Sequence, residues 1–217
     1  MYYYFFASST TGAIGANSST HSPSITVTTT NPDGTTTTTT EFDPNLIPAG
    51  CVVLGPYETL DANQQAVLDA PQAYLYQNGA FVSNPAYPSI QLQQAKMTQI
   101  ASINAGFNAT LNGGFTAKTL VGGATSPHTY PSDAVAQSNF TGIVAAFTAN
   151  TSKTSTMINT IDAGWVSHTK AEFFGVFSDG DNWKEAQYVQ LATPLAQVQT
   201  ATTVADVQKA VWTPATY

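Results

Sequence analysis

The chain has 217 residues, of which 42% are hydrophobic and only 9% are charged. Six Lys and no Arg stand against thirteen acidic residues, so the formal net charge is -7. Nucleic-acid binding needs clustered cations that displace counterions from phosphates, and this composition excludes it as an expected function. Attachment to anionic membrane surfaces is disfavoured for the same reason.

Hydroxyl and amide side chains take the place of charges on the polar surface, with Thr as the most frequent residue. No run approaches about 18 apolar residues, so we expect no membrane insertion. The apolar start, Met1 to Phe6, lacks a positive segment, and no signal peptide is expected. Cys51 has no second Cys for an internal disulfide, which leaves the compartment open. This composition is typical of extracellular assemblies such as virions.

The first 45 residues have the pattern of β-structure. An aromatic strand is expected over residues 2–7, followed by a Ser/Gly/Asn-rich loop from Ser8 to Ser22. Two β-branched runs then follow, Ser24 to Thr30 and Thr35 to Phe42. Between them, Asn31-Pro32-Asp33-Gly34 has the residues of a tight turn, because Pro presets φ and Gly supplies a positive φ. The sequence therefore predicts a β-hairpin.

Almost every side chain of this hairpin is Thr, so neither face has the apolar set that would bury it on a core. Two interpretations stay open: a solvated, frayed hairpin, or a ribbon stabilised by contacts in an assembly. On the second interpretation, the assembly contacts come from the two runs and their turn: Thr28, Thr30, Asn31, Asp33, Gly34 and Thr36.

Residues 46–87 are expected to form a small module. It contains a short buried strand, Cys51 to Leu54, and a helix from Asp61 to Asp69 with Asp61 as its N-cap. A second hairpin is expected to turn at Asn78-Gly79, a dipeptide that accepts the type I′ turn. Three rings that flank this turn are candidates for stacking on sugars or for core packing: Tyr74, Tyr76 and Phe81.

The longest periodic segment, Ser89 to Leu111, predicts an amphipathic helix that turns Met97, Ile103 and Phe107 to one side. A strand is expected from Phe115 to Val121. A second helix should begin near Ser132 and carry five apolar residues inward: Val135, Phe140, Ile143, Val144 and Phe147. The stretch Asn150 to Ser155 is expected to be a loop or a helix end.

Towards the C-terminus, strands are expected at Trp165-Val166 and Phe173 to Ser178, with a turn at Asp179-Gly180-Asp181. A helix should follow from Gln187 to Gln199, with Pro194 near its first turn or at a kink. A terminal helix capped by Thr203 should dock its Trp on the domain, with its apolar side formed by Val207, Ala210, Val211 and Trp212.

These elements predict an α+β fold in three parts. The first is a Thr-rich N-terminal β-hairpin region (1–45), and the second is the strand, helix and hairpin module (46–87). The third is a C-terminal domain (88–217) in which helices pack on a small antiparallel sheet.

The residues that could carry chemistry are few. His21, His128 and His168 lie far apart in sequence, and no catalytic motif spacing is present. Asp179, Asp181 and Asn182 have Ca²⁺-type oxygens but lack the full loop pattern, so a turn with Asx hydrogen bonds is favoured. We therefore expect no catalytic residues, no cofactor and no metal, and Cys51 is interpreted as a packing residue.

Several stretches resemble known phage sequences. The opening MYYYFFASSTTGAIG resembles the start of many phage tail and tail-fibre-assembly proteins. Three further stretches are similar to a phage-enriched domain family of unknown function: AKMTQIASINAGF (Ala95 to Phe107), HTYPSDAVAQSNFTGIV (His128 to Val144) and ATTVADVQKAVW (Ala201 to Trp212). The matching positions are Tyr130, Ser132, Asp133, Gln137, Asn139, Thr203, Asp206, Val207, Gln208 and Trp212.

This resemblance implies a bacteriophage tail protein, and it assigns no catalytic residue. We expect a structural component of the virion that acts in assembly and host attachment. Its expected partners are further copies of itself, other tail proteins and host surface polysaccharide. Two alternatives stay open: a tail-fibre assembly chaperone that is absent from the finished particle, and a glycan-binding module that recognises the receptor.

Overall fold

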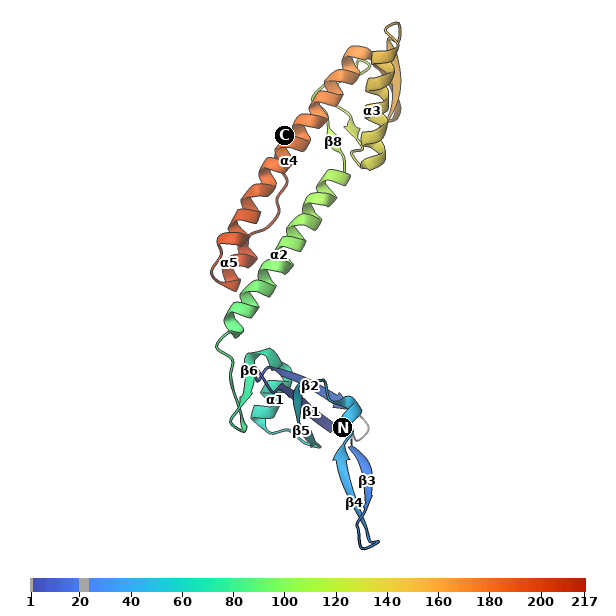
Figure 1. The fold of residues 1–217 in the computed structure, drawn as a ribbon. Coiled ribbons are helices and arrows are strands. Elements are labelled where there is room, and N and C mark those ends of the chain that lie inside the picture. Colours follow the sequence, from blue (N-terminus) through green and yellow to red (C-terminus); the bar gives the residue numbers. More distant parts are fainter. Residues whose placement is uncertain (1, 20–23) are drawn as a thin grey trace. The chain divides into compact units, whose positions relative to one another are not determined.

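The computed structural model describes residues 2–19 and 24–217 and shows an α+β protein with small antiparallel sheets (Figure 1). The chain divides into two compact units, which we call unit 1 (Met1–Ile90) and unit 2 (Gln91–Tyr217). The expected boundary between residues 45 and 46 falls inside unit 1, because strands from both sides of it pair in one sheet.

Unit 1 is built on a three-stranded antiparallel sheet in the order β2-β1-β5. Its elements, in chain order, are β1 (Tyr2–Ser8), β2 (Ile14–Ser19), β3 (Ser24–Thr30), β4 (Thr36–Phe42), η1 (Pro44–Leu46), β5 (Cys51–Tyr57), α1 (Ala62–Asp69), η2 (Pro71–Ala73), β6 (Tyr74–Gln77) and β7 (Ala80–Ser83). Phe5, Ile14 and Val67 form the buried cluster of this unit, so β1, β2 and α1 share one core.

The loop expected from Ser8 to Ser22 is wrong in part, because β2 pairs with β1 from Ala7↔Ile14 onwards. Gly12 makes the return turn with φ 71°, a conformation that favours Gly. The strand expected at Cys51 is confirmed as β5, but it is not fully buried, since Cys51 is half-buried and Val52 is exposed. His21 lies outside the described residues.

Two predicted local features of unit 1 are confirmed. Helix α1 begins after Asp61, whose side chain accepts from the backbone N–H of Gln64, and the Gln64 side chain accepts in return from the N–H of Asp61. The hairpin of β6 and β7 turns at Asn78-Gly79 with φ 52° and 84°, as a type I′ turn requires.

Unit 2 contains two long helices, α2 (Tyr87–Asn112) and α4 (Lys170–Thr200), and several shorter helices and strands. Helix α2 begins in unit 1 and continues into unit 2. The other elements are β8 (Phe115–Thr116), β9 (Thr129–Tyr130), α3 (Ala134–Ala149), β10 (Ser155–Thr160), β11 (Gly164–Thr169) and α5 (Val204–Lys209). Figure 1 shows α2 alongside α4, and Ile103 of α2 packs with Val198 of α4 and Val207 of α5.

The strand and turn expected over residues 173–181 are wrong, because this stretch lies inside α4. Thr169 and Glu172 form a capping box that starts the helix. Gly180 is a point of close approach, since a Cβ there would lie 2.6 Å from the ring of Phe115. Pro194 is buried within the helix and not near its first turn. Gly180, whose residue type suggests a turn, therefore allows the Phe115 ring to pack closely against α4.

Other expectations in unit 2 are corrected more locally. The strand expected from Phe115 to Val121 is reduced to β8, because the backbone N–H groups of Lys118 and Thr119 donate to the Asp179 carboxylate at 2.9 and 2.8 Å. Ser155, expected in a loop or helix end, instead begins strand β10. Met97, Val135 and Val211 are exposed and not turned inward as expected.

The C-terminal segment docks on unit 2, as predicted for Trp212. The indole Nε1 donates to Thr110 Oγ1 at 2.9 Å, and the ring lies against Gly106, where a Cβ would be 2.8 Å from it. The fully buried Gln187 amide also holds this segment by bonding both backbone groups of Ala215. The chain after α5 is therefore part of the domain.

Candidate functional site

The Thr-rich hairpin forms a two-stranded ribbon of β3 and β4, which we call the Thr ribbon (Ser24–Phe42). Its pairing is continuous from Ser24↔Phe42 to Thr30↔Thr36. The Thr side chains of both strands are exposed on both faces, and the hydroxyls of Thr28 and Thr38 lie 3.4 Å apart across the strands. The ribbon therefore buries no apolar layer within the described chain.

The turn of the Thr ribbon is held by its own side chains. The Asn31 amide donates to the hydroxyls of Thr35 and Thr37 at 2.9 and 3.1 Å. The Asp33 carboxylate accepts from the hydroxyl and the backbone N–H of Thr35 at 2.6 and 2.9 Å, which lowers the pKa of Asp33. Gly34 adopts φ 83°. This network fixes the register that the uniform Thr faces do not fix.

The Thr ribbon is anchored at its base. Phe42, at the end of β4, packs edge-on against Tyr4 and Phe6 of β1 with ring centroids 5.2 and 6.2 Å apart. The structure thus brings the six predicted assembly residues (Thr28, Thr30, Asn31, Asp33, Gly34 and Thr36) into one ribbon, and the Phe42 ring ties this ribbon to β1 through two aromatic contacts.

The three rings predicted for sugar stacking or core packing lie outside the Thr ribbon, beside the core of unit 1. Tyr74, Tyr76 and Phe81 are half-buried and pack against the core cluster of unit 1. Phe81 lies 5.3 Å from Phe5 and 5.4 Å from Tyr76 between ring centroids. These contacts agree with the core-packing alternative.

The other chemically active side chains do not form a cluster. Within the described ranges 2–19 and 24–217, no three His, Cys, Asp or Glu side chains lie close enough to hold a metal ion. His128 and Asp162 form a pair at 2.8 Å, and Asp162 also accepts from the backbone N–H of Thr129. Hydrogen bonding from His128 lowers the pKa of Asp162. This pair joins the β9 and β10–β11 segments.

The aspartates weighed as Ca²⁺ ligands lie on α4, so neither a Ca²⁺ loop nor an Asx turn is present there. Asp179 instead accepts two backbone N–H groups and the Thr119 hydroxyl, which lies at 2.8 Å. Glu172 likewise accepts from the backbone N–H of Gly122 at 3.0 Å. Both carboxylates therefore serve to hold the 117–122 segment on α4.

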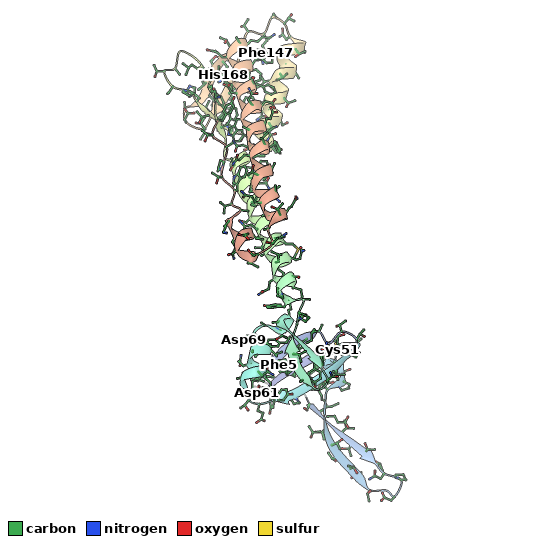
Figure 2. All side chains as sticks on the ribbon, turned by 90° about the vertical axis from the view of Figure 1, so that its left-hand side faces the viewer. Phe5, Cys51, Asp61, Asp69, Phe147 and His168 are labelled. Atoms are coloured by element: carbon green, nitrogen blue, oxygen red, sulfur yellow. The ribbon has the colours of Figure 1, made fainter. Side chains whose placement is uncertain are left out.

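A fully buried polar pair, Tyr130 and His168, lies in the core of unit 2 (Figure 2 labels His168 near Phe147). The imidazole Nδ1 lies 2.9 Å from the Val166 carbonyl, which can only accept, so Nδ1 carries the proton. The neutral ring therefore accepts at Nε2 from the Tyr130 hydroxyl, 2.9 Å away. Burial raises the pKa of Tyr130 and lowers the pKa of His168. The pair joins β9 to β11.

This pair predicts a pH-dependent stability for unit 2. The folded state holds His168 neutral, whereas the unfolded chain binds a proton at the ordinary His pKa of about 6.5. The free energy of unfolding is therefore expected to fall as the pH drops from 7 to 5. Urea unfolding at each pH, followed by Trp fluorescence, measures it, because all three Trp residues lie in unit 2.

Two variants isolate the His168 contribution. A double variant, Tyr130→Phe with His168→Phe, replaces both partners by apolar rings and should remove the pH dependence. A His128→Asn variant should keep it. Hydrogen bonds lower the pKa of Asp162 and of Glu172, so these carboxylates stabilise the fold only as the pH rises above the ordinary carboxyl pKa of about 4 in the unfolded chain, which lies below the His168 window. An unchanged slope in the double variant would contradict the assignment.

A surface groove lies between α3 and the β10–β11 hairpin and is lined by residues from both faces of β10. Its volume is about 660 Å³, and Trp165, Asn159 and Asn139 are among the residues that line it. Strand alternation would place Trp165 and Asn159 on one face, but the sequence predicts a loop or helix end at Asn150 to Ser155 and no strand over residues 155–160. Among the described residues, no helix is long and apolar enough to cross a membrane.

Comparison with known proteins gives one match. A family model described as "Domain of unknown function (DUF4376)" matches residues 94–211, which include most of unit 2. No curated protein and no solved structure matches the chain. Since the matched residues make up more than half of the sequence, the chain belongs to the DUF4376 family of domains of unknown function.

Proposed function

We propose that the chain is a structural component of a bacteriophage tail, in a tail fibre or near the tail tip or baseplate, that acts in virion assembly and host attachment. In this proposal the Thr ribbon makes the assembly contacts, and no step of the function is chemical. The observation that carries it is the ribbon itself, whose Phe42 ring packs on β1 at its base and whose Thr side chains are exposed on both faces.

An assembly role is supported by the low stability that a two-stranded ribbon has when no further strand or surface packs against it. An isolated two-stranded hairpin is marginal in water, and within the described chain β3 and β4 pair only with each other. Both outer edges therefore offer backbone N–H and C=O groups to further strands. Thr hydroxyls bury at lower cost than charges, which suits a surface that becomes covered by neighbours.

The phage assignment rests on the sequence resemblance of the opening strand and of three stretches in unit 2. The chain composition agrees with it, since 9% charged residues and a net charge of -7 leave few ions to desolvate at interfaces. Further copies of the chain and other tail proteins are the proposed partners. The assembly chaperone, absent from the finished particle, is the alternative that the experiment below separates.

The test is the protein content of purified virions produced with two forms of the chain. The first is the natural chain. The second is a ribbon-deleted variant in which Asn-Gly replaces residues 25–41, a replacement that the direct pairing of Ser24 with Phe42 permits. We expect a stoichiometric amount of the natural chain by mass spectrometry and loss of the ribbon-deleted form. The ribbon-deleted form should stay soluble and keep the melting temperature of the natural chain, because the core of unit 1 is intact.

A Thr28→Ser, Thr38→Ser variant serves as the matched control, since it keeps both hydroxyls of the cross-strand pair. It should enter virions as the natural chain does. Absence of the natural chain from virions contradicts the structural proposal and leaves the chaperone. Full incorporation of the ribbon-deleted form contradicts the role of the ribbon.

A further inference from the structure

The groove between α3 and the β10–β11 hairpin is lined in part by an exposed indole, that of Trp165. Trp165 pairs directly with Asn159, and strand alternation places both on the outer face together with Met157. On the opposite face, Ile158 and His168 are buried in the core. The Trp165 side chain is 69% exposed, although Trp is a residue that normally buries most of its area. The buried inner face holds this exposed indole on a fixed strand.

The groove also contains polar groups without partners. The side chains of Asn139 and Asn159 are exposed and make no hydrogen bond to any other part of the described chain. Ser138, beside Asn139 on α3, is equally free. The two amides and the hydroxyl therefore offer both hydrogen-bond donors and hydrogen-bond acceptors near the Trp165 indole.

The groove has almost no charge. No Lys is among its lining residues, so a sulfate, phosphate or carboxylate group would find no cation there. Its one acidic residue, Asp133, is the N-cap of α3 and accepts from the backbone N–H of Ala136 at 2.8 Å. The chemistry of the groove therefore fits a neutral ligand with many hydroxyl groups.

We propose that this groove binds a neutral oligosaccharide. The C–H face of a pyranose ring is apolar and can lie flat on the Trp165 indole, while hydroxyls at the ring edge bond the amides of Asn139 and Asn159. A pocket of about 660 Å³ is in the range of small-ligand sites. The inference deepens the host-attachment part of the proposed function and rests on it for its biological meaning, but its test on the isolated chain fails separately from the virion test.

A second copy of the chain, or an apolar peptide, is the less suitable occupant. Covering the groove with an apolar surface would bury the free amides of Asn139 and Asn159 without hydrogen bonds, at a cost of about 1–3 kcal/mol each. A saccharide satisfies these groups and covers the indole at the same time.

The experiment is a titration of the full chain with maltohexaose, cellohexaose and chitohexaose, followed by Trp fluorescence and isothermal calorimetry. Heparin hexasaccharide serves as the anionic comparison. Since Trp183 is buried and Trp212 is half-buried, an emission shift reports mainly on Trp165. We expect at least one neutral hexasaccharide to bind and the heparin fragment not to bind.

Two variants localise the binding. Trp165→Ala should weaken it by about tenfold or more, as loss of a central aromatic anchor does, while Trp165→Tyr should retain part of it. Gly142 lines the groove, and a Cβ there would meet nothing within 4 Å. Gly142→Leu should therefore fill the groove and abolish binding without lowering the melting temperature, because Leu is the better helix former.

Val189→Ala, which removes an exposed apolar side chain from α4 outside the groove, is the control and should bind as the natural chain does. Three results would overturn the proposal. They are no binding of any neutral hexasaccharide, binding that survives both Trp165→Ala and Gly142→Leu, and a dimer in sedimentation that only these two variants dissociate.

Discussion

Replacing Phe173 by Ala is expected to lower the free energy of unfolding of unit 2 by about 3–5 kcal/mol, the range for a buried Phe in a packed core. The Phe173 side chain is fully buried. Its ring lies 5.4 Å from Phe147 and 5.9 Å from Phe140 between centroids. Truncation leaves a cavity among rings that α3 and α4 hold in place. Urea denaturation followed by Trp fluorescence measures the loss.

Phe174→Ala is the matched control, because it removes the same side chain from the next position of α4. The Phe174 side chain is 37% exposed, so its loss leaves less of a cavity. We expect a change of about 1 kcal/mol, typical of a partly exposed site. Equal losses for the two variants would show that α4 does not bury Phe173 as described.

Replacing Asp179 by Ala is expected to cost about 2–3 kcal/mol, because its carboxylate accepts three hydrogen bonds from the 117–122 segment. Without it, the backbone N–H groups of Lys118 and Thr119 lose their acceptor while Val121 still has to pack in the core. The free energy of unfolding and the hydrogen exchange of these two amides measure the effect. Both amides should exchange faster.

Asp181→Ala is the control for the charge. Asp181 lies two residues further along α4, is exposed and makes no hydrogen bond to the described chain. Its removal should change the free energy of unfolding by less than about 0.5 kcal/mol. An Asp179→Asn variant keeps one acceptor oxygen and should lie between the two. Slow exchange of the Lys118 and Thr119 amides in Asp179→Ala would contradict the assignment.

The two proposals concern different units and fail separately. The Thr ribbon in unit 1 is tested in virions, whereas the groove in unit 2 is tested on the isolated chain. A chain absent from virions that still binds a neutral oligosaccharide through Trp165 would support the glycan-binding alternative. A chain in virions that binds none would leave the Thr ribbon as its functional surface.

Local chemistry predicted the short-range features of this protein. The Asn31-Pro32-Asp33-Gly34 turn, the Asn78-Gly79 turn, and the caps at Asp61 and Thr203 are present where the sequence places them. Each depends on φ preferences or on a side chain that bonds a backbone group within a few residues. Such features need no distant partner, so the sequence alone determines them.

The identity of the 173–181 stretch depended on distant residues. Its aromatic and β-branched composition favours a strand, and Asp179-Gly180-Asp181 favours a turn. Positions 173, 176, 180, 183 and 187 nevertheless repeat at steps of three and four, the spacing of one helix face. Gly180 belongs to this face because the Phe115 ring occupies the space of its side chain, which only the tertiary structure shows.

By itself, then, the sequence determined the turns, the caps, the α+β class and the exposure of a Thr-rich ribbon, all of which follow from residues close together in the chain. Tertiary structure decided that Tyr74, Tyr76 and Phe81 pack in a core while Trp165 stays exposed. It also paired Trp165 with Asn159 and set both beside α3. The groove forms from segments that are distant in sequence and come into contact only in the folded chain. The composition or periodicity of any one segment therefore cannot predict it.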